Sequence, residues 1–179
     1  ERLRDQIDEP DLWLLFAPIK RARLDFLVQK AVELGVSRIS PVYTDHTEVK
    51  RLNSERHRFN VIEAAEQCER LTLPEFTEPC PLAAALDEFP SNRQMLVCAE
   101  RGDATPLEEL LHEPEARGTS YAFLCGPEGG FSQTELDGFD KLSFIRLVSL
   151  GPRILRAETA ALSAVACWQA TLGDWRRRP

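Results

Sequence analysis

Short apolar runs alternate along the chain with longer stretches in which apolar residues recur every three or four positions. The apolar runs are residues 12–17, 39–43, 94–99, 121–125 and 144–150. Runs of this length without polar alternation are typical of strands that are buried on both faces. Strands that alternate with helices predict an α/β fold with a mostly parallel sheet and helices on both faces.

The helical segments carry recognisable end signals. Gly35 is expected to cap the C-terminus of a first helix, and Ser54 to cap the N-terminus of a second helix that ends near Arg70. The last helix is predicted over about residues 155–172. The side chains expected to face the core are Leu24, Leu27, Val28, Ala31 and Leu34 in the first helix and Phe59, Ile62, Ala65 and Cys68 in the second.

The segments between these elements are shorter and less regular. Residues 45–53 are polar and predict a loop, and the three prolines of residues 73–81 predict extended or irregular chain. Short helices are expected over residues 82–89 and after Thr105-Pro106. Ser132 and Glu135 form an S-x-x-E capping box, which predicts a helix that opens at Ser132.

These elements predict one domain over residues 11–175, preceded by residues 1–10 as a tail or the remnant of an upstream linker. Residue 1 is Glu rather than Met, so we expect the chain to begin inside a longer protein. No apolar run approaches the roughly 20 residues that span a bilayer, and the first residues are charged rather than signal-like. We expect a soluble, cytoplasmic protein.

Cysteine and histidine usage argues against a metal site. The five cysteines form no C-x-x-C pair, and the three histidines are widely spaced, at residues 46, 57 and 112. We expect reduced, mostly buried thiols. Cys125 precedes a glycine turn, but it ends an apolar run and has no histidine near it in the sequence. We interpret it as a buried thiol rather than a nucleophile.

The formal net charge is −7, which argues mildly against a nucleic-acid-binding protein. The basic residues are nevertheless clustered. Ordinary solvated surface explains these clusters, and we prefer it for residues 176–178, whereas the clusters at residues 20–23 and 50–58 could instead form a local positive face. The clusters are Lys20, Arg21 and Arg23; Lys50, Arg51, Arg56 and Arg58; Arg153 and Arg156; and Arg176, Arg177 and Arg178.

Two glycine-bearing turns each follow a predicted buried strand, and we expect these two strands to be neighbours in the sheet. One is GPEGGFS at residues 126–132, and the other is LGPRILRAETA at residues 150–160. Ligands of open α/β sheets bind at the carboxyl ends of the strands, and glycine lets the backbone approach a ligand closely. GPEGG is neither a phosphate-binding P-loop nor a G-x-G-x-x-G fingerprint. Taken alone, it is equally well explained as an ordinary tight turn.

Four segments together resemble the ribosomal RNA small-subunit methyltransferase E family, which belongs to the SPOUT class. They are FLVQKAVELGV (26–36), AAEQCER (64–70), LCGPEGGFSQTEL (124–136) and LGPRILRAETAAL (150–162). The resemblance implies a C-terminal deep trefoil knot, a homodimer, S-adenosylmethionine as cofactor, and methylation of N3 of a uridine in 16S ribosomal RNA. The chain departs from the family at Glu69, where the family often has Gly, and shows no counterpart of the family's N-terminal PUA-like domain.

The resemblance also implies roles for individual residues. Arg156 would stabilise negative charge on the uracil oxygens, and Glu128 would act as a general base, orient Arg156 or hold the methionine amino group. No residue is expected to bind a metal. The cofactor residues would be Ala99, Glu100, Leu124, Gly126, Pro127, Gly129, Gly130, Leu150, Gly151, Ile154 and Leu155. The RNA-binding residues would be Lys20, Arg21, Arg23, Lys30, Arg70 and Arg153.

Each role has a simpler alternative. Arg156 could be a helix-start residue paired with Glu158 or Glu128, and Glu128 could only hold its turn. Lys30 and Arg70 could belong to a solvated helix face. Three other functions stay open: a SPOUT enzyme that acts on another RNA or on a ribose 2′-hydroxyl, a non-catalytic RNA-binding or ribosome-assembly module, and an unrelated α/β nucleotide-binding protein.

Overall fold

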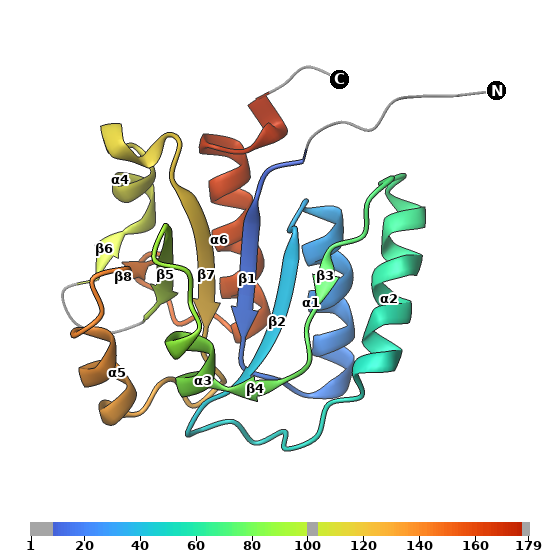
Figure 1. Ribbon diagram of the computed structural model, residues 1–179, viewed down its shortest axis with the longest axis horizontal. Coiled ribbons are helices and arrows are strands. Elements are labelled where there is room, and N and C mark those ends of the chain that lie inside the picture. Colours follow the sequence, from blue (N-terminus) through green and yellow to red (C-terminus); the bar gives the residue numbers. More distant parts are fainter. Residues whose placement is uncertain (1–8, 100–103, 177–179) are drawn as a thin grey trace.

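The computed structural model describes residues 9–99 and 104–176, which form one layered α/β structure (Figure 1). The strands are β1 (Leu12–Phe16), β2 (Arg38–Tyr43), β3 (Glu75–Phe76), β4 (Cys80–Pro81), β5 (Arg93–Cys98), β6 (Thr105–Pro106), β7 (Ser120–Cys125) and β8 (Ile145–Ser149). Every strand pair is parallel, in the order β3-β2-β1-β7-β5-β8-β6, with β4 beside β2. The prediction of a mostly parallel sheet is confirmed.

Helices cover both faces of the sheet, as predicted (Figure 1). They are α1 (Arg21–Glu33), α2 (Ser54–Gln67), α3 (Leu82–Asp87), α4 (Leu107–Leu111), α5 (Gln133–Phe139) and α6 (Ala157–Thr171), with 3-10 turns η1 (Pro114–Ala116) and η2 (Asp174–Arg176). Successive residues of each strand point to opposite faces. Leu14 and Phe123 therefore join the core under α1, α2, α4 and α6, and Leu15 and Leu124 join the core under α3 and α5.

Helices α1 and α2 end in the same hydrogen-bonded motif. At α1 the N–H of Gly35 donates to Val32 O and that of Val36 to Ala31 O, with Gly35 at φ +80°. At α2 the left-handed residue is Glu69, at φ +59°. A residue without Cβ adopts this conformation at no steric cost, whereas Glu69 is strained. The departure from the family pattern noted at Glu69 therefore falls on a position that favours glycine.

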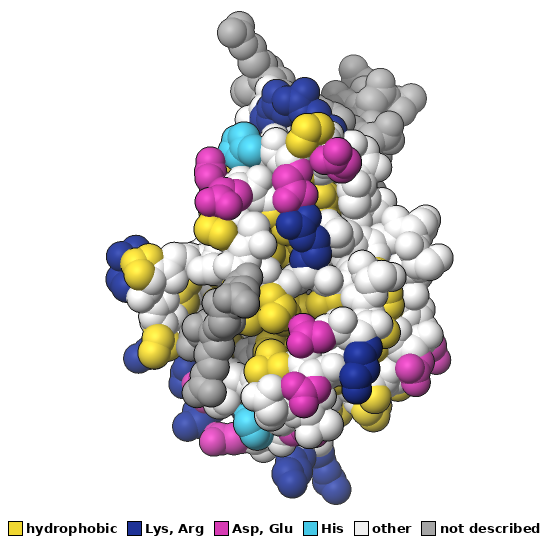
Figure 2. Space-filling view, turned by 90° about the vertical axis from the view of Figure 1, so that its left-hand side faces the viewer, with side chains coloured by type: hydrophobic (Ala, Val, Ile, Leu, Met, Phe, Trp, Pro, Cys, Tyr) yellow, Lys and Arg dark blue, Asp and Glu magenta, His cyan; other side chains and the backbone are white. Residues whose placement is uncertain are grey.

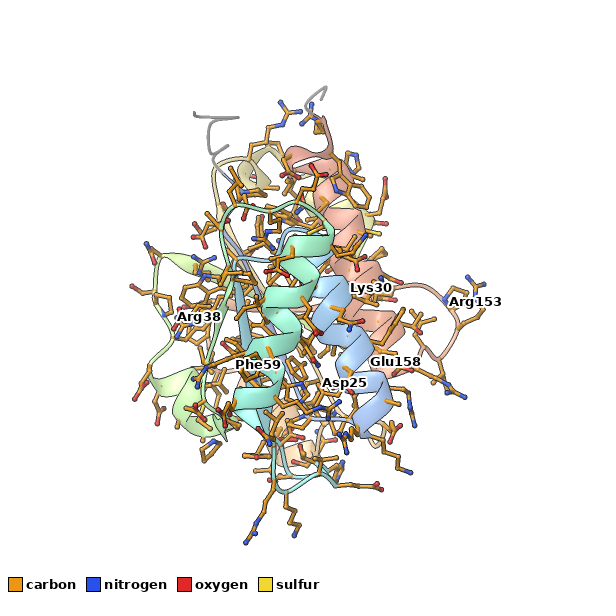
Figure 3. The ribbon with its side chains drawn as sticks, turned by 90° about the vertical axis from the view of Figure 1, so that its right-hand side faces the viewer. Asp25, Lys30, Arg38, Phe59, Arg153 and Glu158 are labelled. Atoms are coloured by element: carbon orange, nitrogen blue, oxygen red, sulfur yellow. The ribbon has the colours of Figure 1, made fainter. Side chains whose placement is uncertain are left out.

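The inward face of α2 differs from the prediction. Phe59 is 60% exposed and Ile62 is 38% exposed, whereas His57, Val61 and Ala64 are buried (Figure 3). Apolar residues lie on both sides of this helix, so spacing alone did not identify the face that packs on α1. The helix is capped by the side chain of Asn53, which accepts from the N–H of Arg56, rather than by Ser54.

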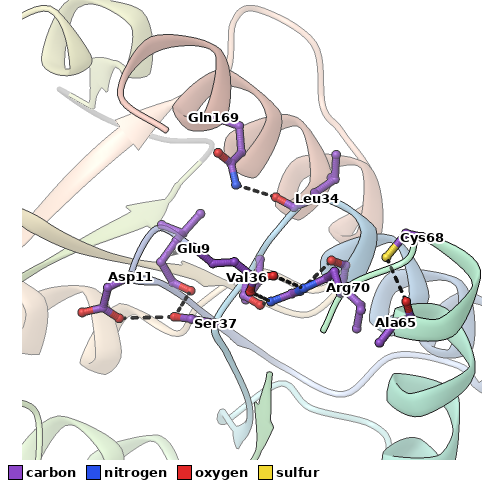
Figure 4. A network of polar contacts seen from close by, with 11 residues as sticks. Glu9, Asp11, Leu34, Val36, Ser37, Ala65, Cys68, Arg70 and Gln169 are labelled. Carbon is purple, nitrogen blue, oxygen red and sulfur yellow. Dashed lines mark hydrogen bonds and ion pairs between the residues drawn. The ribbon is translucent and has the colours of Figure 1, made fainter. Parts of the chain in front are cut away.

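Ion pairs join the amino ends of the strands and the elements beside them. Arg93 pairs with Asp11, and its guanidinium also donates to the carbonyl of Tyr121 at 2.9 Å and lies 3.9 Å from the Trp13 ring centre. Arg146 pairs with Glu113 at 2.6 Å, which raises the pKa of Arg146 and lowers that of Glu113. Arg70 pairs with Glu9 and donates to Val32 O and Val36 O (Figure 4).

Within the two described ranges, no helix is both long enough and apolar enough to cross a membrane.

Candidate functional site

A cavity of about 1000 Å³ lies at the carboxyl ends of β7, β5 and β8. The two glycine turns follow β7 and β8. The prediction that these two strands are neighbours is wrong, because β5 lies between them. Because all strands are parallel, their carboxyl ends still meet at one edge. The lining residues include Ala99, Gly126, Pro127, Glu128, Gly129, Gly130, Leu150, Gly151, Arg153, Ile154, Leu155 and Arg156.

The first loop, residues 126–132 between β7 and α5, is held by hydrogen bonds. The N–H of Gly130 donates to Pro127 O at 2.9 Å and closes a turn, with Gly130 at φ +69°. The predicted capping box is confirmed: Ser132 accepts from the N–H of Glu135, and the Glu135 carboxylate accepts from the N–H of Ser132. The turn presents backbone groups to the cavity without side chains at Gly129 and Gly130.

The second loop, residues 150–156 between β8 and α6, has open space beside Gly151 and an exposed apolar side chain. Gly151 adopts φ +102°, and a Cβ added there would meet no atom within 4 Å. Its N–H donates to Ser149 Oγ at 3.2 Å. Ile154 is 85% exposed. Hydrophobic side chains also gather around a hollow on the side that carries β8 and α5 (Figure 2).

These features fit a ligand with a flat, partly apolar group and several hydrogen-bonding atoms. The cavity has room beside Gly151, an apolar side chain at Ile154 that is not buried by the chain itself, and backbone from two loops. Ligand sites of this kind are mostly apolar with a few placed polar groups. The residues present therefore fit S-adenosylmethionine.

Glu128 is ion-paired with Arg23 of α1, not with Arg156. Arg23 also lies 3.8 Å from a carboxylate oxygen of Glu158, the second residue of α6. Glu158 is buried, and its Oε2 accepts no hydrogen bond from the described residues. Arg23 thus lies between the carboxylates of Glu128 and Glu158, which come from the two loop regions. Because Glu128 pairs with Arg23, it does not orient Arg156.

Arg156 lines the cavity at the start of α6, where its side chain is exposed. Within residues 9–99 and 104–176 no carboxylate lies within ion-pair distance of Arg156, so the alternative of a pair with Glu158 or Glu128 is wrong. Arg153 lies on the same loop and points away from the body of the protein (Figure 3). Both guanidinium groups are available to an external anion.

Several predicted residues lie elsewhere. Leu124 is fully buried against Ala122 and Phe139 on the α3–α5 side, so its side chain does not line the cavity. Glu100 lies outside the described residues. Lys30 pairs with Glu33 at 2.7 Å, and the guanidinium of Arg70 is occupied by Glu9 and two carbonyls. Arg70 therefore joins α1 to the segment before β1, and its role as an RNA contact stays a prediction.

Two residues that the sequence analysis missed hold the first loop. His46 Nδ1 lies 3.2 Å from Gly129 O and 3.1 Å from Gly130 O, and it donates to them as the Nδ1–H tautomer. The N–H of Asp45 donates to Glu135, and Ser132 Oγ donates to the Asp45 carboxylate. Both residues follow β2. The loops that follow parallel strands lie at the same edge of the sheet. This rule is the one signal in the sequence that could have placed Asp45 and His46 near the first loop.

The cysteines play no nucleophilic part in this geometry. Cys125 and Cys98 are register partners on β7 and β5, and a hydrogen bond that the Cys125 thiol donates to Cys98, together with burial, raises the pKa of Cys125 well above its usual value. The cysteines are free, as expected, but only Cys125 is buried and Cys167 is exposed. The described residues contain no cluster of side chains that could hold a metal ion.

Comparisons with known proteins agree on one family. A family model described as "RNA methyltransferase domain" matches residues 8–169. Ribosomal RNA small subunit methyltransferase E of Rickettsia conorii is 32% identical over 92% of this chain and 68% of its own length. The crystal structure of the protein of that name from Neisseria gonorrhoeae, bound to S-adenosyl methionine, is 32% identical with a TM-score of 0.83, over 93% of this chain and 68% of that one.

A more distant likeness supports the fold alone. The A. aeolicus TrmH/SpoU tRNA modifying enzyme is 11% identical, with a TM-score of 0.59 over 91% of this chain and 76% of its own. The chain thus shares its architecture with SPOUT methyltransferases and spans about two thirds of the length of the methyltransferase E relatives named above.

Proposed function

The chain belongs to the RNA methyltransferase domain family, and from this premise we propose that it uses S-adenosylmethionine to methylate N3 of a uridine in 16S ribosomal RNA. One observation carries the proposal: the two glycine loops meet at a single cavity whose free arginine, Arg156, could face a reacting base. The solved relative that is bound to S-adenosyl methionine supports the choice of cofactor.

S-adenosylmethionine supplies a methyl group that is already activated by its bond to a sulfonium sulfur. The task of the chain is therefore to hold the two reacting atoms in line, which is worth at most about 7–11 kcal/mol. We propose that Gly130 and Gly151, where an added Cβ would meet no atom within 4 Å, leave the space in which the donor lies, and that Leu150, Ile154 and Leu155 contact its apolar surface.

Uridine N3 carries a proton and becomes a nucleophile only when that proton passes to solvent; the new N3–CH3 bond then forms as the S–CH3 bond breaks, and S-adenosylhomocysteine leaves. The resulting negative charge spreads onto O2 and O4 of the base. A fixed cation beside those oxygens stabilises the transition state, and arginine stays charged at every working pH. We assign this role to Arg156, because its side chain lines the cavity and has no carboxylate partner among the described residues.

We assign Glu128 a positioning role rather than that of the general base. A carboxylate that is engaged with the guanidinium of Arg23 is less available to accept a proton from N3. The ion pair instead fixes the first loop to α1, and the 3.8 Å approach of Arg23 to Glu158 extends this connection to the second loop.

The trefoil knot, the homodimer, a cytoplasmic location and the boundaries of the domain are parts of the same proposal, supported by the resemblance to the family. In that family a PUA-like domain assists RNA binding. We expect the chain by itself to bind S-adenosylmethionine and to methylate RNA slowly.

The chemical position of the new methyl group tests the proposal. The chain is incubated with a 16S ribosomal RNA transcript and methyl-labelled S-adenosylmethionine, and the digested nucleosides are identified by mass spectrometry. We expect N3-methyluridine, which also stops reverse transcriptase because the methyl group blocks base pairing. A methyl group on a ribose 2′-hydroxyl, or no transfer from a chain that binds the cofactor, would contradict the proposal.

A further inference from the structure

The basic side chains of this protein fall into two groups, those with a carboxylate partner and those without. The partnered ones are Arg23, Lys30, Arg38, Arg56, Arg58, Arg70, Arg93 and Arg146. In the part of the chain that the structure describes, no carboxylate lies within ion-pair distance of the others. The charge of a partnered cation is already neutralised and offers little to an external ligand. A cation without a partner can bind an external anion.

Most of the free cations follow the carboxyl ends of strands. Lys20 and Arg21 follow β1, Lys50 and Arg51 follow β2, and Arg153 and Arg156 follow β8. Parallel strands bring these loops to one edge, the lower edge in Figure 1, where the cavity also opens. The remaining free cations, Arg117, Lys141 and Arg176, do not follow strands.

The loop after β2 is joined directly to the rim of the cavity. Lys20, Glu48 and Val49 line a smaller cavity of about 280 Å³, which lies against Pro127, Glu128 and Gly129 of the first glycine turn. Lys50 and Arg51 come next in the chain and are exposed. His46 links the same loop to Gly129 and Gly130. The free cations of this loop therefore continue the surface that leads to the large cavity.

Unpartnered cations gather at this edge although the protein as a whole is acidic, with a net charge of −7. They lie on the loops after β1 and β2, which are neighbouring strands, and on the loop after β8, which lies further along the sheet; the loop after β2 also carries Asp45 and Glu48. Unpartnered cations near one another repel and contribute nothing to the fold, but they are favourable for a polyanion that releases counterions on binding. An RNA strand is the polyanion that must reach this edge if its uridine is to enter the cavity.

We propose that the loop over residues 44–53 is an RNA-binding element, in which Lys50 and Arg51 contact phosphates of the strand that carries the target uridine. Arg153 and Lys20 contact the same strand on either side of the cavity. The proposal rests on the function proposed above and extends it to a loop that the sequence analysis treated only as part of a basic cluster, without naming its residues as RNA contacts.

The test compares two double variants that remove the same charge. In one, Lys50→Ala and Arg51→Ala are combined. In the matched control, Arg117→Ala and Lys141→Ala remove two exposed, free cations that do not lie on the carboxyl-edge loops. Affinity for a labelled 16S ribosomal RNA fragment is measured by fluorescence anisotropy over a series of salt concentrations, and affinity for S-adenosylmethionine by calorimetry.

We expect the first variant to bind the RNA at least tenfold more weakly at low salt, with the control within twofold of the unchanged protein. The slope of log K against log salt should fall by about 1.4, since each phosphate contact with a single strand contributes about 0.7. Equal losses in the two variants, or no loss in the first, would overturn the proposal, and so would an unchanged slope.

The outcome is separable from that of the proposed function. RNA affinity and its salt slope are read without any methyl transfer, so a chain that methylates a different atom can still confirm this surface. Conversely, N3 methylation with an unimpaired Lys50 and Arg51 variant would leave the function standing and remove the loop from RNA binding. Unchanged affinity for S-adenosylmethionine in both variants shows that the fold is intact.

Discussion

The two edges of the same sheet are built from similar residues in opposite ways. At the amino edge, arginines meet carboxylates and carbonyl groups, as in Arg93 with Asp11 and Arg70 with Glu9. At the carboxyl edge, Arg23 pairs with Glu128, but Arg153 and Arg156 have no carboxylate partner among the described residues. The amino edge uses its arginines to stabilise the fold, and the carboxyl edge leaves two of them available to ligands.

This difference explains why an exposed basic residue is uninformative until its neighbours are known. Arg70 and Arg156 have the same side chain, and both lie beside segments typical of the family. Only the first has its guanidinium committed inside the protein. The contrast between the edges can be sharpened by matched substitutions, one at each edge.

The largest effect is expected from a side chain at Gly151. Gly151→Val places two methyl groups in open space at the cavity, and affinity for S-adenosylmethionine should fall more than a hundredfold. Gly118 is the matched control, because it has φ +86° and nothing within 4 Å of an added Cβ, but precedes β7 at the amino edge. Both variants should lose about 1–3 kcal/mol of stability from backbone strain. Equal cofactor affinity in the two variants, measured by calorimetry, would place the cofactor elsewhere.

The next effect concerns stability at the amino edge. Arg93→Ala removes the hydrogen bonds to Tyr121 O and Asp11, and the free energy of unfolding should fall by about 2 kcal/mol. Arg58→Ala, which breaks an exposed pair with Glu78, should cost less than about 1 kcal/mol. Urea denaturation measures both. A large loss of cofactor affinity in folded Arg93→Ala protein would contradict the division of roles.

A smaller, kinetic effect is expected at Arg156. Arg156→Ala should lower the turnover of methyl transfer more than tenfold, or by more than about 1.4 kcal/mol in the barrier, while cofactor affinity stays within a few-fold. Arg117→Ala removes an exposed arginine of the opposite edge and should leave turnover unchanged. Near-normal turnover in Arg156→Ala would remove this residue from the mechanism.

The smallest effect is a gain in stability. Glu69→Gly relieves the left-handed conformation at the end of α2, and the free energy of unfolding should rise by about 1 kcal/mol. Glu69→Asn, which tolerates this conformation better than Glu, should show part of the gain. Since α2 ends at the amino edge, cofactor affinity should not change. A loss of stability in both variants would show that the side chain of Glu69 outweighs the strain.

Much of this arrangement follows from local sequence signals. The apolar runs identify the long strands, and the capping box at Ser132 and the glycines at 126–130 and 151 identify the loops that line the cavity. Strand order does not follow, because the insertion of β5 between β7 and β8 depends on contacts between distant segments. The contact of His46 with the first glycine turn could not be predicted either. His46 binds the backbone carbonyls of Gly129 and Gly130, and every residue has such a carbonyl, so the sequence carries no signal for this partner.

Two features of the structure could not be deduced from local spacing. Helix α2 carries apolar side chains on two faces, so the exposure of Phe59 could not be deduced from its spacing. The acidic partner of Arg70 is Glu9, which lies 61 residues away in the sequence. Distant pairing of this kind decides whether a charged side chain is structural or functional.

A crystal structure of the chain grown with S-adenosylmethionine tests the central claim most directly. The account predicts the donor in the cavity at the carboxyl edge, with its adenine and methionine groups against residues 126–130 and 150–155 and its sulfonium facing Arg156. A donor bound at the amino edge, or a cavity filled by the side chains of its own loops, would contradict the account.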